Sequence, residues 1–218
     1  MSAKKGLTVA EAAGREASAR GEGYAPPVLL APAFVALSLL LAGAPAPVRV
    51  LLTTELGELE LEVDVARAPV SGKNFLRYLE AGHYEGGLFH RTVRPDNQPT
   101  NKVKIDVVQA GAAPAKEQAG FPAVPLERTR DTGLRHVDGA VSMARAGPDT
   151  ATSDFFVCLG PQPELDFGGR RNPDGQGFAA FGRVVKGMDV VRRIHAAPAD
   201  GQTLTPPIRI VKARVVKP

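Results

Sequence analysis

After residue 47, apolar and polar residues alternate along short segments, which is the pattern of β-strands that bury one face. The alternation is strict at 58–63 and present at 48–54, on either side of Glu55-Leu56-Gly57. These two segments are therefore predicted to form a β-hairpin. Further strands are predicted at residues 87–93, 104–109, 139–143, 154–159, 178–185 and 208–216.

Two segments have helical spacing instead. Between Ala68 and Tyr84, apolar residues fall on one helix face, with Pro69 in the first turn and Gly82 at the end. Residues 187–194 predict a second, shorter helix. Many short strands, two helices and loops rich in glycine and proline predict a mainly β fold, a closed antiparallel barrel, because closure removes exposed strand edges. The predicted core face of the first helix consists of Val70, Phe75, Leu76, Tyr78 and Leu79.

The first 47 residues have a different character. Residues 1–24 are polar and rich in alanine, and the apolar run 28–42 is shorter than the roughly 20 residues of a membrane-spanning helix. This run matches the apolar part of an export signal, and the small residues at 42–46 offer cleavage sites. The chain is therefore predicted to contain an extension, 1–47, which ends in a Pro-Ala linker, and one domain, 48–218.

Three interpretations of the apolar run remain open. A cleaved signal, which is favoured, would place the protein in the periplasm or outside the cell. An uncleaved segment would anchor it in a membrane, and membranes are expected as partners only in that case. A tail that is not a signal would leave the protein in the cytoplasm.

Composition argues against several classes of function. The formal net charge is +4, and the basic residues are spread along the chain rather than gathered in a stripe with aromatics, so nucleic acid is not an expected partner. The four histidines lack metal-ligand spacing, and no metal is expected. Residues 168–177 lack the lysine of a phosphate-binding loop, and no G-x-S-x-G motif of a serine hydrolase occurs. The single cysteine, Cys158, is expected to be a buried, uncatalytic thiol.

Candidate chemistry lies in three stretches, 89–91 (FHR), 142–148 (SMARAGP) and 153–157 (SDFFV). They combine an arginine with apolar strand residues, which suits a pocket that binds an apolar ring and places a cation beside an amide. Rotation about an X-Pro bond needs such a pocket, because it breaks amide resonance across a barrier of roughly 18–20 kcal/mol without any covalent step. An always-charged guanidinium with several N–H donors can stabilise the twisted amide.

The motifs FHRTV, VVQAG, GAVSMARAGPDTATSDFFVCL, ELD and FAAFGRVVKGMDVV, in this order and followed by the closing strand, resemble those of a bacterial cyclophilin, a peptidyl-prolyl cis-trans isomerase. The resemblance covers roughly residues 48–216. It implies an eight-stranded antiparallel barrel capped by two helices, with the site on its outer surface. It also implies an enzyme that needs no cofactor and acts on proline-containing polypeptides during protein folding. A monomer is expected, although the sequence does not identify the oligomeric state.

The same resemblance assigns site residues. Arg91 corresponds to the catalytic arginine, and Gln109 to the glutamine that orients it and bonds the substrate backbone. Phe156 corresponds to the floor of the proline slot, while Phe155 is expected to point into the barrel because strand neighbours alternate. The substrate-binding residues are expected to be Val107, Met143, Ala144, Arg145, Ala146, Asp154, Phe156, Leu165 and Phe178.

The chain departs from the family pattern at several positions. Asp106, Arg145 and Asp154 put charges where the family has neutral side chains, Glu164 replaces a tryptophan, and Ala110 replaces a glycine. The three charges leave open the alternative of a proline-peptide binding module with little catalysis. A general holdase chaperone is a third alternative. His90, next to the arginine, is expected to face inward.

Overall fold

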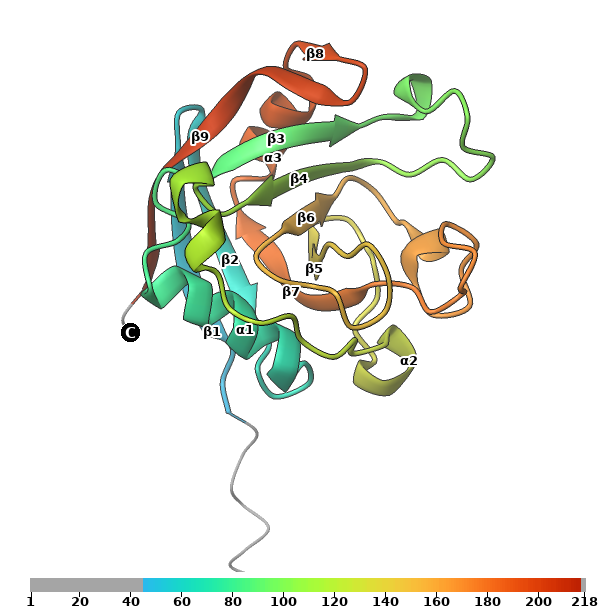
Figure 1. Cartoon of the computed structure of the whole chain (residues 1–218), viewed down its shortest axis with the longest axis horizontal. Helices are drawn as coiled ribbons and strands as arrows, with labels where there is room; N and C mark the ends of the chain where they lie inside the picture. The colour runs from blue at the N-terminus through green and yellow to red at the C-terminus, as the bar shows by residue number, and fades with distance from the viewer. Residues whose placement is uncertain (1–44, 217–218) are drawn as a thin grey trace, which may run out of the picture. The chain divides into compact units, whose positions relative to one another are not determined.

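The computed structural model describes residues 45–216 (Figure 1). The segment 28–42, on which the signal and anchor interpretations depend, lies outside the described residues. Among the helices within 45–216, none combines the length and the apolar character needed to cross a bilayer.

Within this part of the chain, eight antiparallel strands form a closed barrel, which confirms the predicted fold. Their order is β1-β2-β7-β5-β6-β4-β3-β9, and β9 pairs with both β3 and β1, so that the sheet closes on itself. A two-residue strand, β8 (Ala199–Asp200), pairs with the start of β9. The barrel strands are β1 (Val48–Thr54), β2 (Gly57–Val63), β3 (Leu88–Val93), β4 (Val107–Gly111), β5 (Ala140–Met143), β6 (Phe155–Cys158), β7 (Ala179–Lys186) and β9 (Thr203–Val215).

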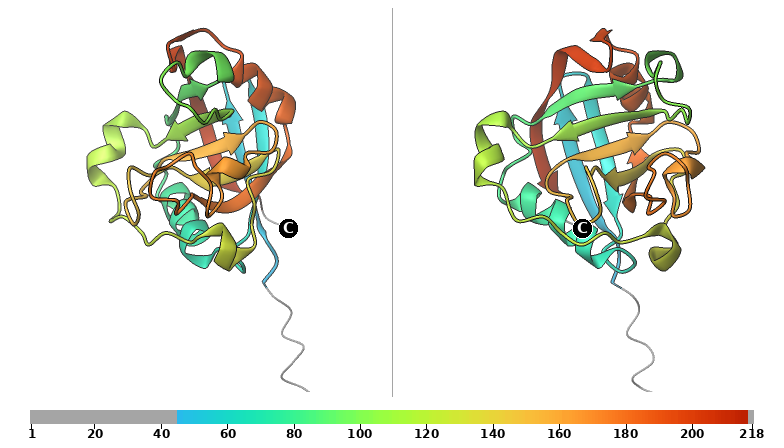
Figure 2. Two further views of the ribbon diagram at one scale, coloured as in Figure 1. Left: turned by 90° about the vertical axis from the view of Figure 1, so that its right-hand side faces the viewer. Right: turned by 45° about the vertical axis from the view of Figure 1, so that its right-hand side comes forward.

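Two longer helices cover the ends of the barrel. Figures 1 and 2 show α1 (Pro69–Glu80) at the lower end and α3 (Met188–His195) toward the upper end. The predicted face of α1 is buried at Phe75, Tyr78 and Leu79, but Val70 is 36% exposed because it lies in the first turn, at the rim. The remaining short helices are α2 (Thr129–Thr132) and the 3-10 turns η1 (Pro95–Asn97), η2 (Pro114–Ala119) and η3 (Pro163–Leu165).

The apolar side chains form two clusters on opposite faces of the same strands. Inside the barrel, Phe155 packs edge-on against Phe75 and Tyr84, with ring centroids 5.3 and 5.4 Å apart. On the outside, Phe156 packs with Val107 and with Leu165, which belongs to the connection after β6. The inward direction predicted for Phe155 is confirmed, and strand alternation places Phe156 on the outer surface.

Candidate active site

A groove of about 440 Å³ lies on the outer face of β3, β4 and β6. These three strands are neighbours in the sheet (Figure 1). Strand residues form its base, and the connections before β4, after β5 and after η3 form its walls. Its lining consists of Arg91, Ile105, Val107, Gln109, Ala144, Arg145, Ala146, Thr150, Thr152, Asp154, Phe156, Leu165, Arg171, Asn172 and Phe178.

Arg91 is held in the groove by two glutamines. It faces Gln109 across the β3–β4 ladder, and its Nη1 donates to Gln109 Oε1 at 3.0 Å. Its Nε and Nη2 donate to Gln202 Oε1 at 3.0 and 2.5 Å. Burial lowers the pKa of the Arg91 guanidinium, yet an arginine keeps its charge at neutral pH. The sequence reasoning missed Gln202, which follows β8 and belongs to none of the quoted motifs.

Gln109 is fixed in turn by Asp154. Its Nε2 donates to Asp154 Oδ2 at 2.9 Å, so its amide oxygen is left to accept from Arg91. A side chain at Gly111 would clash with the Asp154 carboxylate, so the glycine there makes room for this contact. Ala110, the departure in the same segment, points into the barrel and leaves the groove unchanged.

His90 does not face inward, and that prediction is wrong. The β3 ladder shifts register between Phe89 and Arg91, and such a bulge adds a residue that breaks the strict alternation of side chains. The His90 side chain is 38% exposed, and its Nε2 lies 3.6 Å from Asp154 Oδ2. His90 and Arg91 therefore both lie outside the barrel.

The apolar part of the groove is built on Phe156. Its ring is 5.4 Å from that of Phe178 and perpendicular to it, and Leu165 and Val107 pack beside it. Ile105 completes this wall and was missed, although its position two residues before Val107 was a usable signal, since residues two apart share a strand face. The Asp106 side chain points away to His195, with Oδ1 and Nε2 2.5 Å apart.

Met143 was predicted to bind the substrate, and that prediction is wrong. It is 1% exposed, packs in the cluster inside the barrel, and does not line the groove. Alternation along β5 is the reason: Ser142 faces outward, Met143 inward, and Ala144 outward again into the groove. The other predicted substrate-binding residues all line the groove.

Arg145 lines the groove but does not offer it a free cation. Its guanidinium makes two parallel bonds to the Asp174 carboxylate, at 2.8 and 2.9 Å, and Nε donates to the Gly177 carbonyl at 2.8 Å. The cation also lies 5.0 Å from the centroid of the Phe178 ring. Hydrogen bonding from Arg145 lowers the pKa of Asp174. Arg145 therefore anchors the 168–177 loop, which forms one wall of the groove.

A buried serine–histidine–aspartate array supports the floor. His136 Nδ1 is 2.8 Å from Asp166 Oδ1, its Nε2 is 2.9 Å from Ser142 Oγ, and its ring stacks on Phe156 at 5.9 Å. This resembles the order of a hydrolytic triad, but Ser142 and the His136 side chain are 0% exposed. A nucleophile must reach its substrate, so the array serves to hold Phe156 in place.

Cys158 is buried in the outer cluster beside this array. Burial raises the pKa of its thiol, which stays protonated and unreactive, in keeping with a small apolar side chain. Within residues 45–216, histidine, cysteine and carboxylate side chains do not gather into a group of three that could hold a metal ion.

Comparison with known proteins agrees with this architecture. The family model described as cyclophilin type peptidyl-prolyl cis-trans isomerase/CLD matches residues 49–215. Peptidyl-prolyl cis-trans isomerase A of Dickeya dadantii is 37% identical over 176 residues, 77% of this chain and 84% of that protein. A peptidyl-prolyl cis-trans isomerase of Acinetobacter baylyi is 34% identical over 161 residues, 73% of this chain and 78% of that protein.

The fold also matches a solved cyclophilin-type isomerase from Cryptosporidium parvum, with a TM-score of 0.63 at 21% identity, over 79% of this chain and 99% of that one. The closed barrel, the groove on its outer face and the match over residues 49–215 lead to one conclusion. The protein belongs to the family of cyclophilin-type peptidyl-prolyl cis-trans isomerases.

Proposed function

We propose that the protein accelerates cis–trans rotation about X-Pro bonds in flexible polypeptide segments, using Arg91 above the Phe156 slot. The observation that carries the proposal is the position of the guanidinium: two glutamines hold it at the edge of an apolar slot. A proline ring fits against Phe156, Leu165 and Phe178, and no covalent step or cofactor is needed.

Arg91 retains donors for the substrate. A guanidinium has five N–H groups, and three of them are used in the bonds to Gln109 and Gln202. The remaining N–H groups, on Nη1 and Nη2, are available to the amide as it twists and loses resonance. Because the glutamines fix the guanidinium before the substrate arrives, little reorganisation is needed, and one such donor is worth about 3 kcal/mol.

The charges that raised the docking-module alternative are engaged within the protein. Asp106 lies against His195, Arg145 is paired with Asp174, and Asp154 accepts from Gln109. Arg145 is neutralised by Asp174, Asp106 points away from the groove, and Asp154 keeps its carboxylate in the groove lining, where it orients Gln109. This favours an isomerase over a charged peptide-docking surface.

Replacing Arg91 with alanine tests the proposal. Loss of one preorganised donor is expected to lower kcat/KM about 100-fold. The rate is measured by NMR exchange on a short Ala-Xaa-Pro-Phe peptide. Arg183→Ala is the matched control, since Arg183 is an exposed β7 residue that pairs with Glu62 and does not line the groove.

Two results would overturn the assignment. If the natural protein binds the peptide without accelerating exchange, the groove is a docking site. If it suppresses aggregation of unfolded proteins equally well with Arg91→Ala, and shows no isomerase activity, it is a holdase.

The site of action is a separate proposal. The apolar run 28–42 and the small residues after it support export to the periplasm or beyond, with the barrel acting there as a monomer. The start of the mature chain is the direct test of this proposal.

A further inference from the structure

Besides Arg91 and the paired Arg145, a third guanidinium lines the groove. Arg171 belongs to the 168–177 loop, and its Nη1 donates to Gln98 Oε1 at 2.8 Å and to the Val103 carbonyl at 2.7 Å. Both acceptors are neutral. Among residues 45–216, neither Arg91 nor Arg171 forms an ion pair with a carboxylate, and the carboxylate in the groove lining, Asp154, accepts from the neutral Gln109 instead.

Neighbouring arginines differ from Arg171, because each of them is paired with a carboxylate. Arg170, the adjacent residue, is neutralised by Glu164 at 2.7 Å, and Arg145 by Asp174. Arg91 and Arg171 both line the same groove, and burial, followed by the charge of Arg91, lowers the pKa of Arg171.

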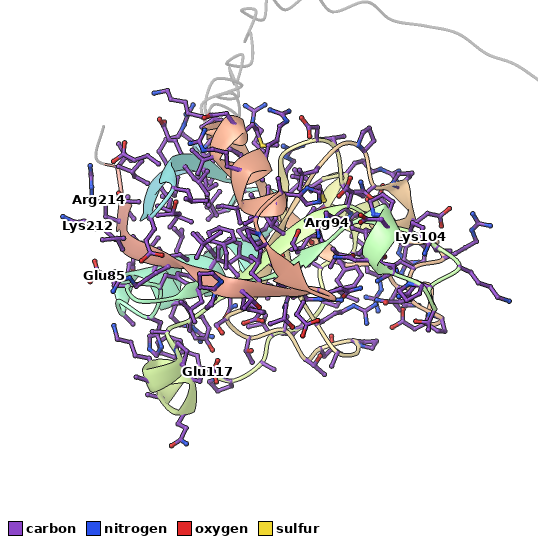
Figure 3. The ribbon with its side chains drawn as sticks, turned by 90° about the horizontal axis from the view of Figure 1, so that it is seen from above. Glu85, Arg94, Lys104, Glu117, Lys212 and Arg214 are labelled. Atoms are coloured by element: carbon purple, nitrogen blue, oxygen red, sulfur yellow. The ribbon has the colours of Figure 1, made fainter. Side chains whose placement is uncertain are left out.

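The surroundings add positive charge at this end of the groove. Lys102 and Lys104 are exposed on either side of Val103, the residue whose carbonyl holds Arg171. Figure 3 shows Lys104 far from Glu117, which lies at the opposite side of the molecule in that view. An anionic group would thus find favourable potential beside Arg171.

Arg171 also has one edge of its guanidinium available to bind a ligand. Its protein hydrogen bonds all come from Nη1, so within the described chain the Nε–Nη2 edge has no acceptor. That edge binds a carboxylate through two parallel bonds, and a guanidinium already anchored loses little side-chain freedom on doing so.

We propose that Arg171 makes the enzyme selective for prolines flanked by an aspartate or glutamate, whose carboxylate binds the Nε–Nη2 edge. This rests on the proposed isomerase function and names its substrate class. The carboxylate adds negative charge beside two cations that have no carboxylate partner among residues 45–216, which a neutral side chain of the same shape does not do.

The test compares matched peptides that carry glutamate or glutamine immediately before or immediately after the proline. By NMR exchange, kcat/KM for one glutamate peptide is expected to exceed that of its glutamine partner about fivefold, and the ratio is expected to fall with added salt. In Arg171→Gln the ratio is expected to approach one. Arg171→Lys keeps the charge but loses the fork, and is expected to retain part of the preference.

Arg170→Gln is the control, because it removes the adjacent arginine, which is exposed and lies outside the groove lining. It is expected to keep the full ratio. Amide spectra of each variant check that the 168–177 loop is still folded. The proposal is overturned if neither glutamate position is preferred, or if Arg171→Gln keeps the preference.

Failure of the proposed function would look different. If no peptide is isomerised, NMR titration of the same peptides still compares their binding. Tighter binding of a glutamate peptide that depends on Arg171 would support the inference. Equal binding of the glutamate and glutamine peptides would contradict it.

Discussion

Asp166 carries a buried charge beneath the groove floor. Its Oδ1 accepts from the His136 backbone N–H at 3.2 Å and lies 2.8 Å from the His136 ring, while Arg135 reaches its Oδ2 at 3.5 Å. Burial raises the pKa of Asp166, but the bonds and charge of His136, with Arg135, lower it by more. The ionised carboxylate therefore stabilises the folded state.

Asp166→Asn is expected to lower the free energy of unfolding at pH 7 by about 1–3 kcal/mol, the usual cost of disrupting a buried polar contact. The folded pKa lies below the unfolded one, so this stabilisation is complete above the unfolded value and disappears as pH falls through the folded value. The penalty should therefore shrink at about pH 3, below the ordinary aspartate pKa. Urea unfolding at both pH values measures it, and an equal penalty at both would contradict this account.

At the scale of elements, the 168–177 loop determines one wall of the groove. It carries Arg171 and Asn172 into the lining, and the Arg145–Asp174 pair anchors it to the segment after β5. The Arg145 side chain is only 2% exposed, so the anchor reaches deep into the molecule. Loop position and groove shape are therefore linked.

Asp174→Asn removes the carboxylate of this anchor. Amide hydrogen exchange at residues 169–177 is expected to become about tenfold faster, because the loop opens locally more often. The KM for the peptide should also rise, because the 168–177 loop then forms a less ordered wall of the groove. Asp189→Asn provides the comparison, because it breaks an exposed pair with Arg193 on α3. Unchanged loop exchange in Asp174→Asn would show that the backbone bonds of the loop hold it without the ion pair.

The elements themselves were largely predictable, with informative exceptions. Strand β4 begins at Val107 rather than 104, because Gln98 bonds the backbone of Ile105 and holds that segment in the preceding loop. Strand β9 begins at Thr203, before the predicted 208, because its first part pairs with β3 and its second with β1. Both shifts depend on contacts with other segments, which local patterning does not contain.

At the scale of the whole molecule, the proposed export signal is expected to be separable from the barrel, because the barrel strands all lie within residues 48–215. The barrel and its groove are described without residues 1–44. If 28–42 is a cleaved signal, its removal should leave isomerase activity intact.

N-terminal sequencing of the protein isolated from its own cells tests this. A start near residues 45–47 is expected, because cleavage by a signal peptidase requires the small residues at 42–46. The cytoplasmic fraction of the same cells serves as the control for unprocessed chain. An intact Met1 in the mature protein would rule out cleavage and favour the anchor or cytoplasmic interpretation.

The sequence by itself determined the barrel strands, the opposite directions of Phe155 and Phe156, and the pairing of an arginine with an apolar slot. These follow from side-chain alternation within each short strand and from the order of the motifs, both of which can be read directly along the chain. Only the tertiary structure decided that Gln202, 111 residues from Arg91, would hold the Arg91 guanidinium. It also decided that Arg145 would pair with Asp174, and that Arg171 would bond only to neutral acceptors in the groove. Such contacts join loops brought together by barrel closure, and their geometry depends on the closed sheet rather than on any local pattern.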